Sequence, residues 1–464
     1  MSRGKDLIKN TGILMIAKIS TQFVSFILLP LYTALLTTSE YGEIDIYTSL
    51  TMIVIPFLTL QLEMGLFRFF ITEKSEGCKK QIISTSFSII ASILIFASLV
   101  YSCLAIALNL KYGQYIYFYY ISMTISIVLL QVCRAYGDSV AYGTASFISS
   151  ALAVCLNVLF IAGLHWKVEG ILLSSTLAQT MSAVYILART RVFRYFDVKC
   201  FNWEIGKRLL GYSVPLVFNQ ISSWTINYSD RLIILTAWGT SANGIYSLAN
   251  KFSNITNTFF NVFNVAWTEN VVRCMADKDS TEYINRMFVL IYNLYFAVIT
   301  GIVNLLPFMF NIMVNKNYND AYGHIPILLL ATFFSGIAAT IGSVYIAYSK
   351  TKEVSITTIA VGVCNIVVHL FLLKTCGLYA ASISTLVSFA LLFLYRYIFV
   401  RKFFHLQISV KVTVPQIIIY LVAWGAYYSE RWVLIAVGLV LNLIYIRYIF
   451  INNKNMIKDM IRNE

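Results

Sequence analysis

The sequence predicts an all-helical, polytopic integral membrane protein with about fourteen transmembrane helices, because its long apolar runs repeat at the length that spans lipid. Of its 464 residues 59% are hydrophobic and 12% are charged, and the mean hydropathy is +0.74. A soluble domain has roughly a quarter of its residues charged. The runs are too long and too continuously apolar for the alternating strands of a membrane β-barrel.

The predicted spans follow one another with short connections. In chain order they are 11–36, 43–66, 82–108, 115–133, 142–164, 168–188, 212–237, 244–267, 284–312, 324–348, 354–373, 377–400, 412–428 and 431–451. The first run is longer than the roughly 7–15 residues of a signal-peptide core, so we interpret it as a retained helix.

The basic residues predict the orientation in the membrane. Of the 35 lysines and arginines, the external loops hold five: Lys111, Lys167, Lys316, Lys374 and Arg431. Most of the others lie at the opposite ends of the spans, so both termini are predicted to be cytoplasmic. The net charge of +14 therefore reports topology and contact with anionic lipids, and we expect no nucleic acid partner. The eight cysteines form no CxxC pair, so we expect neither a metal site nor a disulfide framework.

A weak internal repeat relates the two halves of the chain. "LTTSEYG" (36–42) and "WGTSANG" (238–244) share a Thr-Ser pair and a Gly at matching places. The number of predicted spans between the copies is even, so both enter the membrane in the same direction, as in two-lobed transporters with parallel repeats.

The repeat predicts four parts. They are an N-terminal lobe of six helices at 1–195, a cytoplasmic linker at 196–207, a second six-helix lobe at 208–405, and two extra helices with a cytoplasmic tail at 406–464.

Polar side chains form stripes on the two spans at 212–237 and 244–267, at spacings that place them on one helix face. They either line a cavity or make interhelical hydrogen bonds, and we favour a cavity because the stripes continue over several turns. The predicted lining residues are Gln220, Ser223, Asn227, Asn254, Thr258 and Asn261.

Charged residues inside the spans are expensive unless they face a bundle interior or a wet cavity. We hypothesise that Lys18 and Lys251, each on a polar stripe, line a central cavity and bind an anion by charge-assisted hydrogen bonds. Asp230 and Arg231 are adjacent, so they point about 100° apart and do not simply neutralise each other. Structural ion pairs with neighbouring helices are an open alternative, joining Asp230 to Lys251, or Arg231 to Glu63 or Glu269.

Three acids could instead carry a coupling ion: Glu63, Asp230 and Glu269. No cofactor is expected beyond a proton or sodium ion. Pro30, Pro56 and Pro215 are predicted to bend their helices, since proline removes a backbone hydrogen bond.

The stretch "YSVPLVFNQISSWTINYSDRLIILTAWGTSANGIYSLANKFSNI" (212–255) resembles the start of the second lobe in Wzx-type polysaccharide flippases. These transport O-antigen or capsule repeat units and belong to the MATE-like MOP exporter superfamily. "LLTTSEYGEIDIY" (35–47) is similar to the first-lobe equivalent. MATE exporters usually place an acid on the first helix, where this chain has Lys18, and that departure favours a lipid-linked sugar over an organic cation.

The resemblance implies alternating access that carries an undecaprenyl-pyrophosphate-linked oligosaccharide across the bacterial cytoplasmic membrane, alongside other glycan-assembly membrane proteins. The residues it implies for the anionic headgroup are Lys18, Arg68, Arg134, Arg231 and Lys251. The last two helices are implied in a groove for the lipid tail. Two other functions stay open: an ion-coupled multidrug exporter, and a membrane-embedded glycosyltransferase or polymerase acting on the same carrier.

Overall fold

The computed structural model describes residues 26–190, 192–275, 279–406, 408 and 410–453. Over these residues the regular secondary structure is entirely helical, which confirms the predicted all-helical class. Nine helical segments of the described chain are long and apolar enough to span a membrane, and the bent α3–α4 pair would make ten. The chain is a multi-pass membrane protein.

The described residues divide into two compact units. Unit 1 contains the described chain up to Arg231 together with Gly239–Gly244, and unit 2 contains Leu232–Trp238 and the described chain from Ile245 onward. The predicted lobes rest on the sequence repeat and stay a prediction. Residues 208–231, which that prediction assigns to the second lobe, pack with unit 1.

Unit 1 is built from short and long helices in sequence. They are α2 (Leu29–Leu35), α3 (Thr38–Thr59), α4 (Leu62–Thr72), α5 (Glu76–Ala107), α6 (Gly113–Ala135), α7 (Ser139–Asn157), the π-turn η1 (Val158–Gly163), α8 (Val168–Thr190), and the 3-10 turns η2 (Val192–Tyr195) and η3 (Val198–Cys200).

The short connection predicted between the first two spans forms the first turn of α3. Thr37 and Glu40 form a capping box, in which each side chain accepts from the other residue's backbone N–H. Such a box satisfies two amide groups that a helix N-terminus leaves without partners. The helix therefore begins at Thr38, earlier than the predicted 43.

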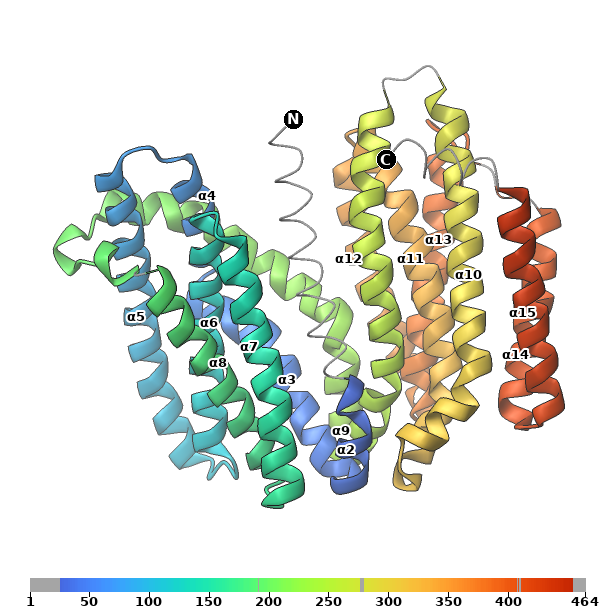
Figure 1. Cartoon of the computed structure of the whole chain (residues 1–464), viewed down its shortest axis with the longest axis horizontal. Helices are drawn as coiled ribbons and strands as arrows, with labels where there is room; N and C mark the ends of the chain where they lie inside the picture. The colour runs from blue at the N-terminus through green and yellow to red at the C-terminus, as the bar shows by residue number, and fades with distance from the viewer. Residues whose placement is uncertain (1–25, 191, 276–278, 407, 409, 454–464) are drawn as a thin grey trace. The chain divides into compact units, whose positions relative to one another are not determined.

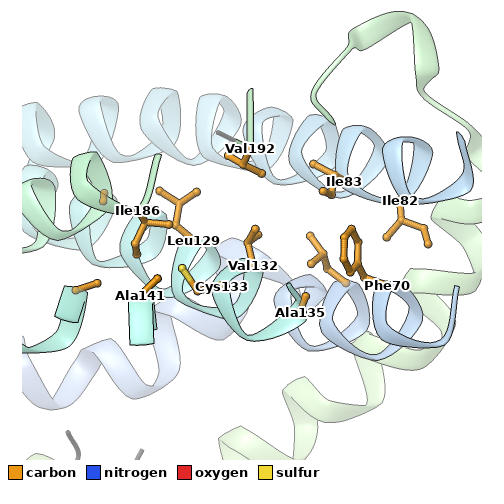
Figure 2. Close-up of a cluster of buried hydrophobic side chains, with 13 residues drawn as sticks. Phe70, Ile82, Ile83, Leu129, Val132, Cys133, Ala135, Ala141, Ile186 and Val192 are labelled. Atoms are coloured by element: carbon orange, nitrogen blue, oxygen red, sulfur yellow. The ribbon is translucent and has the colours of Figure 1, made fainter. Parts of the chain in front are cut away.

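The core of unit 1 is apolar and draws on six elements (Figure 2). Phe70 of α4, Ile83 of α5, Val132 of α6, Ala141 of α7 and Ile186 of α8 are buried against one another. Val192 of η2 closes the same cluster, so the segment after α8 is fixed to the bundle rather than free of it.

The element α9 (Trp203–Cys274) consists of two helices joined at a kink, where Gly239 has the non-helical backbone angle φ 80°. The predicted spans at 212–237 and 244–267 both lie in α9, which is not one of the nine apolar segments. Its many Asn, Ser and Thr side chains lower its hydropathy, and the polar stripes are those predicted from sequence.

Unit 2 continues with the helices drawn from yellow to red in Figure 1. They are α10 (Ser280–Met313), the 3-10 segment η4 (Lys316–His324), α11 (Ile325–Ala347), α12 (Thr351–Cys376), α13 (Tyr379–Val400), α14 (Val410–Ser429) and α15 (Trp432–Asn452). The extra helices α14 and α15 lie side by side against α10 (Figure 1).

Buried amides attach α14 and α15 to α10. Gln416 of α14 donates to the Asn293 side chain at 2.9 Å, and the Tyr445 hydroxyl of α15 donates to the same oxygen at 3.0 Å. Asn442 of α15 donates to the Ala297 carbonyl at 3.3 Å. Lipid offers no hydrogen bonds to such groups, so each contact favours the docked arrangement of the hairpin.

A buried arginine joins three helices of unit 2. Arg396 of α13, only 4% exposed, donates to the Ala338 carbonyl of α11 at 2.9 Å. It also donates to Val354, Thr357 and Thr358 of α12 at 2.9 to 3.2 Å. Among the described residues no carboxylate pairs with it, so neutral oxygens alone satisfy the guanidinium.

We predict that Arg396→Lys lowers thermal stability. Lysine keeps the buried charge but replaces the planar five-donor fork by a single ammonium, which cannot reach the same acceptors on two helices. The apparent melting temperature in detergent, followed by size-exclusion chromatography, should fall by about 5 °C or more. Arg447→Lys, at an exposed position of α15, is the matched control and should change it little. Equal melting temperatures for the two variants would contradict the prediction.

Candidate functional site

The polar residues of unit 1 gather along a seam where α3 and α4 face the first part of α9. The Trp224 indole N–H donates to the Ser49 carbonyl at 3.1 Å. Further along, a Cβ added to Gly65 would meet the Ser213 hydroxyl. The Arg68 guanidinium lies over the Tyr212 ring, 4.4 Å from its centroid. Later residues of α3 and α4 contact earlier residues of α9, so the first part of α9 runs antiparallel to them.

The centre of the seam is an ion pair between Arg231 and Asp45. Arg231 Nε donates to Asp45 Oδ2 at 2.7 Å, and the two side chains are 6% and 12% exposed. Arg231 also donates to the Asn227 carbonyl at 3.2 Å and lies over the Tyr228 ring at 4.7 Å. The Asn243 amide is 3.5 Å from the same Asp45 oxygen.

This pair corrects a sequence interpretation. A structural ion pair is one of the two hypotheses for Arg231, with Glu63 or Glu269 as the predicted partner. The structure confirms an ion pair, but its carboxylate belongs to Asp45. Asp45 was visible only as one member of a polar stripe. A charge so little exposed destabilises the folded chain unless a partner compensates it. Arg231 is therefore held in the seam by its ion pair.

One end of the seam is a close contact between two backbone segments. The hydroxyls of Thr38 and Ser241 are 2.7 Å apart, and those of Ser39 and Thr240 are 2.6 Å apart. The Asn243 amide donates to the Gly42 carbonyl at 3.1 Å.

Two glycines make this approach geometrically feasible. A Cβ on Gly42 would overlap the Thr240 carbonyl oxygen, and a Cβ on Gly244 would overlap the Thr38 carbonyl oxygen. Thr38 thus contacts Ser241, the repeat equivalent of Ser39, and Ser39 contacts Thr240, the repeat equivalent of Thr38. This exchange is the pattern of a two-fold symmetric interface.

The break between α3 and α4 buries the acid Glu63. Leu60 and Gln61 both have positive φ, 47° and 56°, and the two helices are bent by 58°. The Thr59 hydroxyl donates to the Ile55 carbonyl and accepts from the Gln61 N–H, so it stabilises the break. The bend is predicted at Pro56 but lies four residues later, where the backbone adopts left-handed conformations.

Glu63 lies in the first turn of α4 and is 2% exposed. Its Oε2 atom has no hydrogen-bond partner among the described residues. A buried carboxylate left in this state is expensive when ionised, so a proton or a cation at this oxygen would stabilise the folded chain.

The other predicted cations of unit 1 lie at the edge of the bundle. Arg68 is exposed on α4, in the contact with Tyr212 described above. Arg134 is half-buried near the end of α6, donates to Gln131 Oε1 at 3.1 Å, and lies 4.7 Å from the Phe67 ring centroid. Both therefore remain accessible to a ligand.

The predicted polar lining lies along α9. Ser223, Asn227, Asn254 and Asn261 are exposed, and Gln220, Thr258 and Lys251 are half-buried. Asp230 is 5% exposed. Glu269 is exposed and pairs with Arg273 on its own helix, so it is not buried within a span. Lys18 lies outside the described residues.

The structure also contains residues of the seam that sequence analysis did not single out. Asn243 contacts both Asp45 and Gly42, and Trp224 contacts Ser49. The signal for Asn243 was its place in the repeat motif "WGTSANG", directly before the matched glycine.

We predict strong coupling between Arg231 and Asp45. Arg231→Ala and Asp45→Ala each leave one charge buried without its partner, at a cost of about 3–5 kcal/mol. The double variant removes both charges, so its melting temperature should lie well above the additive expectation. The exposed pair Arg286 and Glu282 of α10 is the matched control, for which the single effects should be small and add. Additive effects at the seam would contradict the role of the ion pair.

Comparisons with known proteins place this arrangement in context. The model of a family described as polysaccharide biosynthesis protein matches residues 7–268. No curated protein matches the chain in sequence.

Three solved structures illustrate the likeness in fold. The lipid II flippase MurJ in an inward closed conformation is 15% identical, with 97% of this chain and 100% of that chain covered and a TM-score of 0.69. An inward-facing multidrug resistance MATE family transporter of the MOP superfamily is 15% identical, covering 84% and 97%, with a TM-score of 0.68. A Vibrio cholerae MATE transporter variant is 16% identical, covering 86% and 97%, with a TM-score of 0.53. At these identities the likeness shows the fold alone.

Proposed function

This chain belongs to the polysaccharide biosynthesis protein family, and from that premise we propose that it flips an undecaprenyl-pyrophosphate-linked oligosaccharide across the bacterial cytoplasmic membrane. The family match covers the stretch that contains the seam and most of α9. The MurJ-like and MATE-like fold supports a transporter. We propose alternating access as its mechanism, with both termini in the cytoplasm.

The observation that carries the proposal is the exposure of polar side chains along α9. Ser223, Asn227, Asn254 and Asn261 are exposed although α9 lies in a membrane protein. Lipid offers these side chains no hydrogen bonds. Asn227 donates to the Ser223 carbonyl of its own helix at 2.7 Å, and we propose that water satisfies the remaining donors and acceptors. Amide side chains present both donors and acceptors, which suits the hydroxyl groups of a glycan.

The headgroup of the cargo is anionic, and we propose that Lys18 and Lys251 bind its pyrophosphate. Lys251 lies on the same part of α9 as the exposed amides Asn254 and Asn261 and is half-buried. Arg231 is a weaker candidate because Asp45 already neutralises it. Arg68 is accessible and is proposed to contact the headgroup at an earlier stage, whereas Arg134 lies beside the acids Glu73 and Glu76, which disfavours a pyrophosphate there.

Two alternatives have less support. An ion-coupled multidrug exporter would share the fold, but the family match and the cationic stripe residues favour an anionic glycan carrier. A glycosyltransferase or polymerase would need a structured external pocket that holds a catalytic carboxylate. The predicted external connection between the spans at 284–312 and 324–348, which contains Lys316, is folded as the end of α10 and the short η4.

We predict that loss of the chain blocks glycan export after the lipid-linked unit is complete. In a deletion strain, complete lipid-linked units should accumulate on the cytoplasmic side, measured by their inaccessibility to an external glycosidase in spheroplasts. Complementation with Lys18→Ala or Lys251→Ala should restore export poorly, with normal amounts of protein in the membrane. Lys402→Ala, at an exposed position after α13, should complement fully. Accumulation of incomplete units, or of exported but unpolymerised units, would favour the enzyme alternative.

We also propose that Glu63 carries the coupling ion, because its carboxylate is buried with one oxygen unpartnered beside a helix break. Glu63→Gln keeps the shape but cannot exchange a proton or neutralise sodium. In spheroplasts, wild-type export should slow when the proton or sodium gradient is collapsed by a selective ionophore, whereas export by Glu63→Gln should be slow and insensitive to it. Glu282→Gln, at an exposed acid of α10, should behave as wild type. An ionophore response of Glu63→Gln equal to that of the wild type would refute this assignment.

A further inference from the structure

A cavity of about 410 Å³ lies at one end of unit 1, where α4 ends, α5 begins and α6 ends. Its lining includes Phe70, Glu73, Lys79, Tyr136 and Tyr195. The volume is within the range of about 300–1,000 Å³ typical of small-ligand sites. Phe70 and Ala135 connect it to the buried apolar cluster, so its floor is rigid (Figure 2). The distribution of basic residues predicts that this end is cytoplasmic.

Three aromatic rings form one wall of the cavity. The centroids of Phe70 and Tyr136 are 4.9 Å apart, and those of Tyr136 and Tyr195 are 5.6 Å apart. Phe70 is buried behind the two tyrosines, and the half-buried Tyr136 and Tyr195 offer apolar ring surface next to polar groups. The C–H faces of sugar rings are complementary to such a surface.

The position of Tyr195 is fixed before any ligand binds. The Ser84 hydroxyl donates to the Tyr195 carbonyl at 3.0 Å and accepts from the Asp197 N–H at 2.9 Å. Lys80 pairs with Asp197 at 3.0 Å, so η2 is held on α5 from both sides. A preorganised wall lowers the entropic cost of binding.

The charged groups of the cavity balance one another. Lys79 pairs with Glu76 at 2.8 Å. With Arg134 and Glu73, the lining contains two basic and two acidic side chains. Backbone N–H groups of Ser75 and Lys74 bond the Glu73 carboxylate and lower its pKa, so it stays ionised. A balanced set does not favour a polyanion, whereas carboxylate and guanidinium groups bind vicinal hydroxyls well.

We propose that this cavity is a docking site for sugar rings of the glycan, separate from the residues proposed to bind pyrophosphate. The proposal rests on the proposed function and deepens it. The sugar rings pack on the half-buried Tyr195 and Tyr136. Glu73 accepts hydrogen bonds from the sugar hydroxyls, and Arg134 donates to them. Docking here would select the glycan by its sugars before the headgroup is transported.

The test is direct binding to the full-length protein in detergent. The probe is the oligosaccharide released by mild acid from the lipid-linked glycan of a strain that depends on this chain, titrated calorimetrically. Tyr195→Ala and Glu73→Gln should each weaken binding by about tenfold. Phe201→Ala and Glu204→Gln, at exposed positions of the linker region, are the matched controls and should change it less than twofold. Inorganic pyrophosphate should not compete with the oligosaccharide.

The outcomes separate this proposal from the proposed function. If Tyr195→Ala and Glu73→Gln bind the oligosaccharide as tightly as the controls do, the cavity is not the sugar site, although complementation by the wild-type chain still supports flipping. If inorganic pyrophosphate displaces the oligosaccharide from the wild type but not from Arg134→Gln, the cavity is an anion site and the proposal is wrong. Failure of the flipping assignment would instead appear in the deletion strain, as no accumulated lipid-linked units.

Discussion

The close approach of backbone at Gly42 and Gly244 sets the register of the polar seam. Because neither residue has a side chain, the two segments come near enough for Thr38 and Ser39 to bond their counterparts. That register brings Asn243 to Asp45, and Asp45 in turn meets Arg231. A bulkier residue at either glycine would separate the segments, and the buried charges would lose their geometry.

The two buried arginines show two ways of placing a cation in a low-dielectric interior. Arg231 is neutralised by the carboxylate of Asp45, so its stability depends on a partner that can itself be lost. Arg396 is surrounded by carbonyl and hydroxyl oxygens, and each of its bonds ties one helix of unit 2 to another. Neither is as accessible to an anionic ligand as the half-buried Lys251. Four polar side chains of α9, by contrast, are exposed (Ser223, Asn227, Asn254 and Asn261), and we propose that they contact water.

Part of this structure could be predicted from the sequence. Composition and run length predicted the all-helical membrane class. Of the six residues predicted from their spacing to line a cavity, four are exposed and two are half-buried, and the cavity itself stays a prediction. The partner of Arg231 could not be chosen, because Asp45, Glu63 and Glu269 all lie in or beside spans and the sequence does not say which helix faces α9. The break at Leu60 and Gln61 carried no signal, since neither residue type favours positive φ. The aromatic cavity joins residues such as Phe70 and Tyr195, which are far apart in the chain.

The symmetric contact between Thr38–Gly42 and Thr240–Gly244 has an evolutionary consequence. Two identical half-length chains related by a two-fold axis would form the same contact with themselves, each donating the same hydroxyls to the other. After fusion of two such genes, the hydroxyls and glycines of this contact would still be selected as mutual partners, while the surrounding sequence could diverge. Such a fusion would account for Thr, Ser and Gly at matching places in two segments whose other residues differ.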